Sequence, residues 1–388
     1  MNVLSLMKNY KALPVVLALL LAGCGEELQV GEDSGQEQAI AGGTPFAFVS
    51  RDVTSTEQKL AANSLSPTAY LPGAQLFVRN AISSEANDVE ILASVFGEDD
   101  YDVKDLSVSS DGRYLIFTVH GSAQSDTWNL YEYDFETTSL VRIIRDDAVA
   151  NTGNDTNPTY TNDNLVIFSS DRGDVDSALF TMDRQGQNLQ QVTQTTETDI
   201  QTTSLKDGHV VFMRLNESDC EQNCIGSRSL SDQTQAAETF SVLRMAPSGQ
   251  DLEPLFDGNA LSNTKGVQLD EMIQGADGFM LGILKNRFNP MMGGDIVELR
   301  GPEAKSRSLE SPSSLYEFVQ PKSVAGNGES LAQNTASVTG WYSAFWPYRD
   351  GSSRMLVSWS QCMKAVNGAH RSCTATDNLD GVDPRYGI

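Results

Sequence analysis

The sequence has little positive charge. Its 27 lysine and arginine residues stand against 52 aspartate and glutamate residues, which gives a formal net charge of −25. A surface of this sign repels phosphate backbones, so we do not expect the protein to bind nucleic acid. It repels anionic lipid headgroups as well, so any attachment to a membrane must come from another source.

Residue patterns of common enzymes are also missing. The chain contains no G-x-S-x-G, no H-E-x-x-H and no phosphate-binding glycine loop. Its three histidines, His120, His209 and His370, are scattered, and we expect the first two to be structural and the third to be solvated. Ser262 and Lys265 match S-x-x-K without the companion motifs, which indicates chance. The sequence therefore predicts no catalytic residue.

Long apolar runs are absent beyond the N-terminus, where an export signal is visible. Lys8 and Lys11 precede the apolar stretch Val15–Leu21, which is too short to span a bilayer and is typical of a secretory signal. The following Leu-Ala-Gly-Cys24 resembles the lipobox of bacterial lipoproteins, in which the cysteine is acylated and becomes the first residue after cleavage. Several acyl chains anchor a protein stably. The alternative is an ordinary cleaved signal followed by a chance cysteine.

This pattern predicts the location and the domain boundaries. Residues 1–23 form the signal peptide, and 24–44 form a lipidated, acidic and glycine-rich tether. Residues 45–388 then form the folded domain. Gly25 after the cysteine, by resemblance to enterobacterial sorting, favours the outer membrane. We expect a cell-envelope protein that faces the periplasm or the exterior.

Cysteine is scarce, and its use agrees with export. Apart from Cys24, the chain has Cys220, Cys224, Cys362 and Cys373. In an oxidising envelope the local disulfides Cys220–Cys224 and Cys362–Cys373 are the simplest of the three pairings. Zinc binding competes with this interpretation, but the C-x₃-C pair has no nearby histidine. We therefore expect disulfides and no metal.

What the sequence does contain is a repeat of short β-strands. The unit 157–193 reads as strand, turn, apolar strand, acidic loop, strand, glycine turn and strand. Asp-Gly pairs at Asp111-Gly112, Asp207-Gly208 and Asp277-Gly278 supply the positive φ of tight hairpins. One four-stranded unit cannot bury both of its faces, so copies must stack. Period and strand count favour an all-β β-propeller of four-stranded blades over a sandwich or a solenoid.

The repeat resembles a known family. The unit 157–193 looks like the TolB-type, WD-repeat-like propeller blade, and the broader run from Pro45 onward is similar to proteins related to the middle domain of the hydrazine synthase alpha subunit. The residues that carry the blade resemblance are Pro158, Asp163, Val166-Ile167-Phe168, Ser170-Asp171-Arg172, Leu179-Phe180, Met182-Asp183, Gly186 and Val192-Thr193. The resemblance implies the fold and says little about activity.

Two departures from that family limit what the resemblance implies. Hydrazine synthase works through c-type haems, which need C-x-x-C-H, and this chain has no such motif, so no haem is expected. About five units are visible, so the propeller is either incomplete at the C-terminus or has final blades too diverged to detect.

Two groups of residues could face a ligand. Asp171, Asp174 and Asp176 share one loop and could hold Ca²⁺, although they do not follow EF-hand spacing and acidic turns are expected in a chain of this charge. Trp341, Tyr342 and Trp346 begin an aromatic run that could line a sugar or peptide site or could pack between blades.

Together these features predict a lipid-anchored, cell-envelope β-propeller that acts as a non-catalytic binding or scaffold module for a protein or glycan partner. The alternative is a haem-less subunit of a redox or hydrolytic envelope complex related to the hydrazine synthase alpha subunit.

Overall fold

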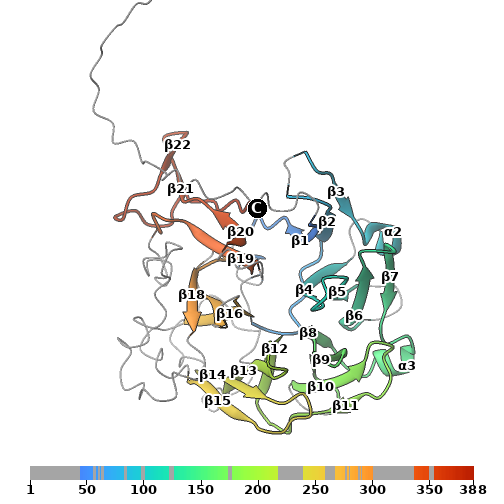
Figure 1. Cartoon of the computed structure of the whole chain (residues 1–388). Coiled ribbons are helices and arrows are strands. Elements are labelled where there is room, and N and C mark those ends of the chain that lie inside the picture. The colour runs from blue at the N-terminus through green and yellow to red at the C-terminus, as the bar shows by residue number, and fades with distance from the viewer. Residues whose placement is uncertain are drawn as a thin grey trace, which may run out of the picture.

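Antiparallel sheets follow one another around a ring in the computed structural model (Figure 1). The structure describes residues 44–55, 58–59, 62, 65–82, 85–97, 101–121, 126–173, 177–216, 239–257, 267–275, 278, 280–286, 289, 291–299, 336–348 and 354–388. The expected signal peptide, the expected lipidation site Cys24, the expected disulfide pair Cys220–Cys224 and nearly all of the expected tether lie outside these ranges.

Five of the described sheets have three or four strands and form blades. In chain order they are β1 (Phe46–Arg51), β2 (Ala74–Arg79) and β3 (Asp88–Glu90); β4 (Asp102–Val108), β5 (Tyr114–His120), β6 (Asn129–Asp134) and β7 (Ser139–Arg142); β8 (Asp155–Tyr160), β9 (Leu165–Ser170), β10 (Ala178–Asp183) and β11 (Gln190–Gln191); β12 (Thr198–Ser204), β13 (Val210–Asn216), β14 (Thr239–Met245) and β15 (Glu253–Asp257); and β16 (Val267–Gln274), β17 (Met280–Asn286) and β18 (Asp295–Leu299).

Two hairpins complete the described sheets. They are β19 (Trp341–Pro347) with β20 (Met355–Ser360), and β21 (Met363–Val366) with β22 (Ala369–Ser372). The first strands β4, β8, β12 and β16 contact one another in turn, and β19 contacts β16, so these strands lie innermost. Figure 1 shows the remaining strands of each blade radiating outward. The prediction of an all-β propeller is confirmed.

Helix is nearly absent from the described part of the chain. The four-residue helices α2 (Ala93–Phe96) and α3 (Asp147–Ala150) lie on connections between blades. Among the described residues, no helix has the length and apolar character needed to cross a bilayer.

The second strands of two blades, β5 and β9, are largely apolar without alternation because both of their faces are buried. In β5, Leu115 and Phe117 pack into a cluster with Leu76 of the preceding blade, whereas Ile116 packs into a cluster with Phe168 of the following blade. Successive side chains of a strand point to opposite faces, so one strand serves two interfaces. Each such side chain contributes about 1.5–3 kcal/mol on burial.

Glycines at the outer hairpin turns allow neighbouring blades to approach closely. Gly186, between β10 and β11, has a φ of 76°, and a Cβ atom there would lie closer than 3.0 Å to the carbonyl oxygen of Ile143 in the preceding blade. Gly249, between β14 and β15, repeats this contact against the carbonyl oxygen of Val192. The turn glycines therefore serve packing between blades as well as turn geometry.

Buried ion pairs hold the innermost strands to their own blades. Asp155 on β8 is fully buried and receives the Arg172 guanidinium at 2.6 Å and the Ser170 hydroxyl at 2.7 Å. Burial nevertheless raises the pKa of Asp155 to about 6, against the opposing effect of Arg172. Asp199 on β12 is likewise fully buried and pairs with Arg214 at 2.6 Å. A buried charge of this kind is tolerated only with its partner in place.

The two ends of the described chain meet where the ring closes. Lys59 bonds Asp383 at 2.8 Å, and the backbone of Gly387 exchanges two hydrogen bonds with Trp359 of β20. A disulfide joins Cys362 to Cys373 at the base of the β21–β22 hairpin, with a Cα–Cα distance of 5.5 Å. This disulfide is one of the two that the sequence analysis favoured.

Candidate binding site at the propeller axis

Each of four innermost strands contains a β-bulge at the same place. The pairing register shifts after Lys104 in β4, Thr156 in β8, Ile200 in β12 and Asp270 in β16. The residue that follows each shift has a left-handed backbone: Asp105, Asn157, Gln201 and Glu271, with φ of 57°, 49°, 55° and 50°. We call these four residues the axial ring.

Such a conformation is costly for residues other than glycine. A single left-handed residue of this kind raises the energy of the native state by about 1–3 kcal/mol, and it persists only where its surroundings enforce it. A bulge also re-aims a side chain away from its regular alternation. The same left-handed bulge in four innermost strands therefore indicates a common structural or functional role for these residues at the axis.

Hydrogen bonds between blades provide part of that enforcement. The Asn157 backbone N–H donates to Oδ2 of Asp105 at 3.0 Å, and the Thr202 hydroxyl donates to the carbonyl of Asn157. Further round the ring, the Gln201 amide donates to Asp270, and the Phe345 backbone N–H of β19 donates to Oε2 of Glu271 at 3.2 Å. The bonds run from β4 through β8, β12 and β16 to β19, so they connect five innermost strands.

The axial ring is rich in carboxylates. Asp270 bonds both Lys285 and Gln201, whereas the hydrogen bonds that reach Asp105 and Glu271 come from backbone N–H groups. Lys104, next to Asp105, points elsewhere, because its ammonium donates to the carbonyl of Pro67 at 2.6 Å and lies 4.1 Å from the centroid of the Trp128 ring. Negative charge therefore exceeds positive charge among the groups in contact at this place.

Burial governs the protonation of these carboxyl groups. Burial first, and the neighbouring Asp270 second, raise the pKa of Glu271 to about 8. Burial also raises the pKa of Asp105, although Lys104 opposes the shift. All four side chains of the axial ring remain half-buried rather than fully enclosed. Because desolvation disfavours the charged form of a carboxyl group, Asp105 and Glu271 keep their protons more readily than they would in water.

The axial ring can accept hydrogen bonds and can hold protons. Within the described ranges, no three His, Cys, Asp or Glu side chains are grouped so that they could hold a metal ion. The chemistry that the geometry supports there is hydrogen bonding and proton exchange.

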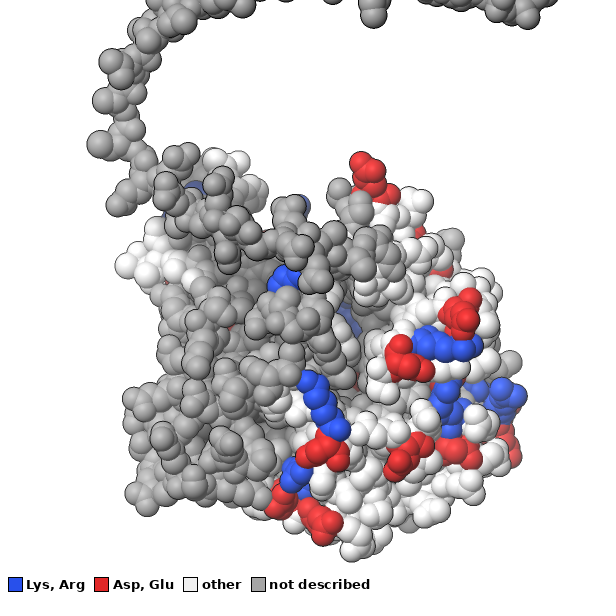
Figure 2. Space-filling model, in the orientation of Figure 1, with Lys and Arg blue, Asp and Glu red and all other residues white. Residues whose placement is uncertain are grey.

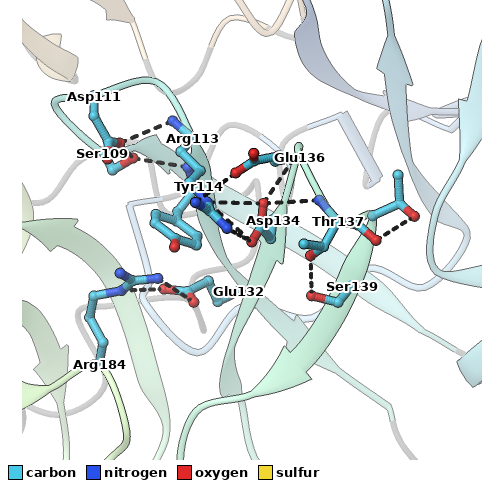
Figure 3. A network of polar contacts seen from close by, with 11 residues as sticks. Ser109, Asp111, Arg113, Tyr114, Glu132, Asp134, Glu136, Thr137, Ser139 and Arg184 are labelled. Atoms are coloured by element: carbon cyan, nitrogen blue, oxygen red, sulfur yellow. Dashed lines mark hydrogen bonds and ion pairs between the residues drawn. The ribbon is translucent and has the colours of Figure 1, made fainter.

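A second polar network lies on the face that carries the hairpin turns (Figure 3). Arg113 contacts Asp134 at 2.8 Å and Glu136 at 2.6 Å, and its guanidinium holds the pKa of Asp134 well below the usual range. Arg184 of the next blade bonds Glu132 at 2.7 Å and lies 3.5 Å from the centroid of the Tyr114 ring. The network thus joins two blades.

Charges on this face are largely paired. Arg244 reaches Asp207 at 2.6 Å and Glu253 at 2.8 Å, which repeats the arrangement around Arg113 in another blade. Figure 2 shows basic and acidic side chains lying next to one another over the described part of the visible face.

The residues that the sequence predicted as ligand-facing are dispersed. Trp341 is fully buried in a cluster with Cys362 and Cys373, so it serves packing, while Tyr342 and Trp346 are half-buried. Asp171 accepts hydrogen bonds from the backbone and the side-chain amide of Asn154 at 2.6 and 2.7 Å, which gives it a structural role. Asp174 and Asp176 lie outside the described residues.

The histidines of the described chain have the surroundings that the sequence indicated. The ring of His120 lies 4.3 Å from that of Tyr70 and 5.3 Å from that of Trp128. His209 contacts Asp207 at 3.1 Å, and His370 is exposed on β22.

Sequence reasoning missed the axial ring, although a signal exists. Each of its residues precedes the left-handed residue of the following hairpin turn by seven positions: Asp105 and Gly112, Asn157 and Asn164, Gln201 and Gly208, and Glu271 and Gly278. The turns were visible in the sequence, but the polar residue at this fixed offset was not recognised.

Comparison with known proteins supports the fold. No family model matches the chain, and no curated protein matches it. Hydrazine synthase from Kuenenia stuttgartiensis is similar in structure, with a TM-score of 0.55 and 12% identity over 82% of this chain. The alignment spans only 42% of that chain. The likeness shows a shared fold.

Two TolB structures also align. The putative TolB from Agrobacterium tumefaciens has a TM-score of 0.32 and 15% identity, over 50% of this chain and 79% of that chain. TolB from Acinetobacter baumannii has a TM-score of 0.37 and 15% identity, over 58% and 46% of the two chains.

Proposed function

We propose that the chain is a lipid-anchored β-propeller of the cell envelope that acts as a non-catalytic binding or scaffold module for a protein or glycan partner. The observation that supports this most directly is the way in which neighbouring blades are fixed to one another. Apolar clusters, turn glycines and the hydrogen bonds of the axial ring all cross from one blade to the next. A rigid ring of this kind displays its loops in fixed positions, which favours recognition.

The described charges narrow the class of partner. On the hairpin-turn face, Arg113, Arg184 and Arg244 are all engaged by carboxylates of the protein itself. Little positive potential is left there to attract a nucleic acid or another strongly acidic molecule. A neutral or basic protein surface, or an uncharged glycan, fits this face better.

Site-specific photo-crosslinking in intact cells tests the proposal. A photoreactive residue at Gln185, which is exposed on the hairpin-turn face, is compared with one at Val95, which is 59% exposed on the outer rim. We expect one dominant adduct from position 185 and weaker or different adducts from position 95. Equal, unspecific adducts from both positions, or none from either, would contradict a binding role for this face.

Lipid anchoring has its own test. Replacing Cys24 by serine removes the predicted acylation site, so the protein should move from the membrane fraction to the soluble fraction of the envelope. Continued association of Cys24→Ser with membranes would show that another feature holds the protein there.

The likeness to hydrazine synthase concerns the fold, and it leaves the haem-less subunit as the alternative. Iron analysis of the purified protein separates the two, since one iron per chain bound without haem would favour a redox subunit and overturn the binding-module proposal.

A further inference from the structure

Glu271 is the point of the axial ring where negative charges converge. It lies on the bulge of β16, next to Asp270 on the same strand, and it interacts electrostatically with Asp105 of β4. The cation that faces this group is Lys285 of β17, which bonds Asp270 directly. From β19, the backbone N–H of Phe345 donates to Glu271. Glu271 and Asp270 therefore share Lys285, whereas the cation that acts on Asp105 is Lys104.

Full ionisation of this group is unfavourable on geometric grounds. Asp270 already bonds the ammonium of Lys285 and the amide of Gln201, so it is the carboxylate best able to keep its charge. Lys104, the other nearby cation, donates to the carbonyl of Pro67. Like charges in a site of low dielectric disfavour a second and a third ionisation. One of the remaining carboxyl groups therefore retains its proton more readily than it would in water.

Glu271 also lies where two sheets join. Its carboxyl group receives the N–H of Phe345, whose ring packs with Ile283 of β17 and Ile296 of β18. The backbone of Tyr342 bonds that of Gly294, just before β18, in the same region. We call this contact between β16–β18 and β19 the β16–β19 seam. A charge that develops at Glu271 must be accommodated at the seam, by entry of water or by separation of the strands.

We propose that Glu271 is a protonation switch of the propeller axis, neutral while the β16–β19 seam is closed and ionised when the seam opens. The inference concerns the ring itself and holds whatever partner the protein binds. It predicts that the propeller is held together more firmly in mildly acidic than in mildly alkaline medium.

The direction of the pH effect follows from proton binding. Between its ordinary pKa of 4.5 and the raised value of about 8, Glu271 is more protonated in the folded than in the unfolded protein. The folded state therefore loses stability as the pH rises through this interval, by up to about tenfold in the folding equilibrium constant per pH unit. An opening of the seam that releases the same proton follows the same dependence.

Hydrogen exchange at the Phe345 amide, measured on the full chain between pH 5.5 and 8.5 and expressed as a protection factor, tests the proposal. In the wild-type protein this protection should fall as the pH rises from 5.5 to about 8, and it should level off above that pH. In Glu271→Gln, which keeps the side-chain carbonyl acceptor and cannot ionise, protection should stay constant. Parallel losses in both proteins would overturn the switch, as would unchanged protection in the wild type.

Two further variants keep the test decisive if Glu271→Gln folds poorly. Asp105→Asn retains an acceptor for the Asn157 N–H and removes one facing charge, so the pH midpoint of the loss should move downward. Asp111→Asn alters an exposed acid in the β4–β5 turn and should leave the profile unchanged. An unmoved midpoint in Asp105→Asn would contradict the proposal.

Discussion

Replacing Gly186 by alanine should destabilise the propeller by more than the strain of a left-handed alanine accounts for. Alanine in that conformation costs about 1–2 kcal/mol wherever it occurs. At position 186 the added Cβ atom would also meet the carbonyl oxygen of Ile143 at less than 3.0 Å, and this obstacle is backbone, which cannot rotate away. Overpacking of this kind adds about 1–3 kcal/mol. We therefore expect a total loss of about 2–5 kcal/mol for Gly186→Ala.

Gly112 supplies the matched control. Its φ of 74° is close to the 76° of Gly186, but a Cβ atom at Gly112 would meet nothing within 4 Å. Gly112→Ala should therefore show the conformational strain alone. Urea denaturation of both variants gives the two losses in free energy of unfolding, and their difference measures the contact between blades. Equal losses would refute the reasoning, whereas Gly249→Ala should behave like Gly186→Ala because it meets Val192 in the same way.

Two further changes test other parts of the fold. Arg172→Met leaves Asp155 buried without its cation, so it should lower the free energy of unfolding by about 3–5 kcal/mol at pH 8. The loss should be smaller at pH 5, where Asp155 is protonated, and denaturation at both pH values checks this. Combining Asp155→Asn with Arg172→Met should recover part of the loss. A loss that is the same at both pH values would argue against a charge effect. Cys373→Ser removes the disulfide with Cys362 and should lower the free energy of unfolding by about 2–4 kcal/mol, which thermal melting measures. Reduction of the wild-type disulfide should lower it by a similar amount. A variant as stable as the wild type would mean that the neighbouring core holds the hairpin without the bond.

The sequence carried the fold because its signals were local. Val166-Ile167-Phe168 indicates a strand buried on both faces, and the glycines at 112, 208 and 278 have the positive φ that their turns require. Cys362 and Cys373 are near enough in sequence for the pairing to be the simplest choice. These features depend on a few adjacent residues and on the elementary geometry of strands and turns.

The axial ring was beyond local reasoning for two reasons. A bulge changes which face of the strand a side chain occupies, so alternation within β8 or β12 gives no warning of it. The hydrogen bonds around the axial ring join residues that are 45 to 74 positions apart in the sequence, and only the assembled ring brings them together. The sequence left two places open for Trp341, a ligand site or packing, and the structure buries it in a core with Cys362 and Cys373.

Strands that are buried on both faces make each blade depend on its neighbours for the burial of its apolar side chains. The fragment that contains β5 without β9 would expose Ile116 to water, and the fragment without β2 would expose Leu115 and Phe117. We therefore expect an isolated blade to expose apolar side chains that the whole protein buries, and such exposure favours aggregation. Shortened versions of this protein should keep several neighbouring blades together, and they should be screened for aggregation. A substitution that disturbs the packing of one blade should first destabilise the two blades next to it.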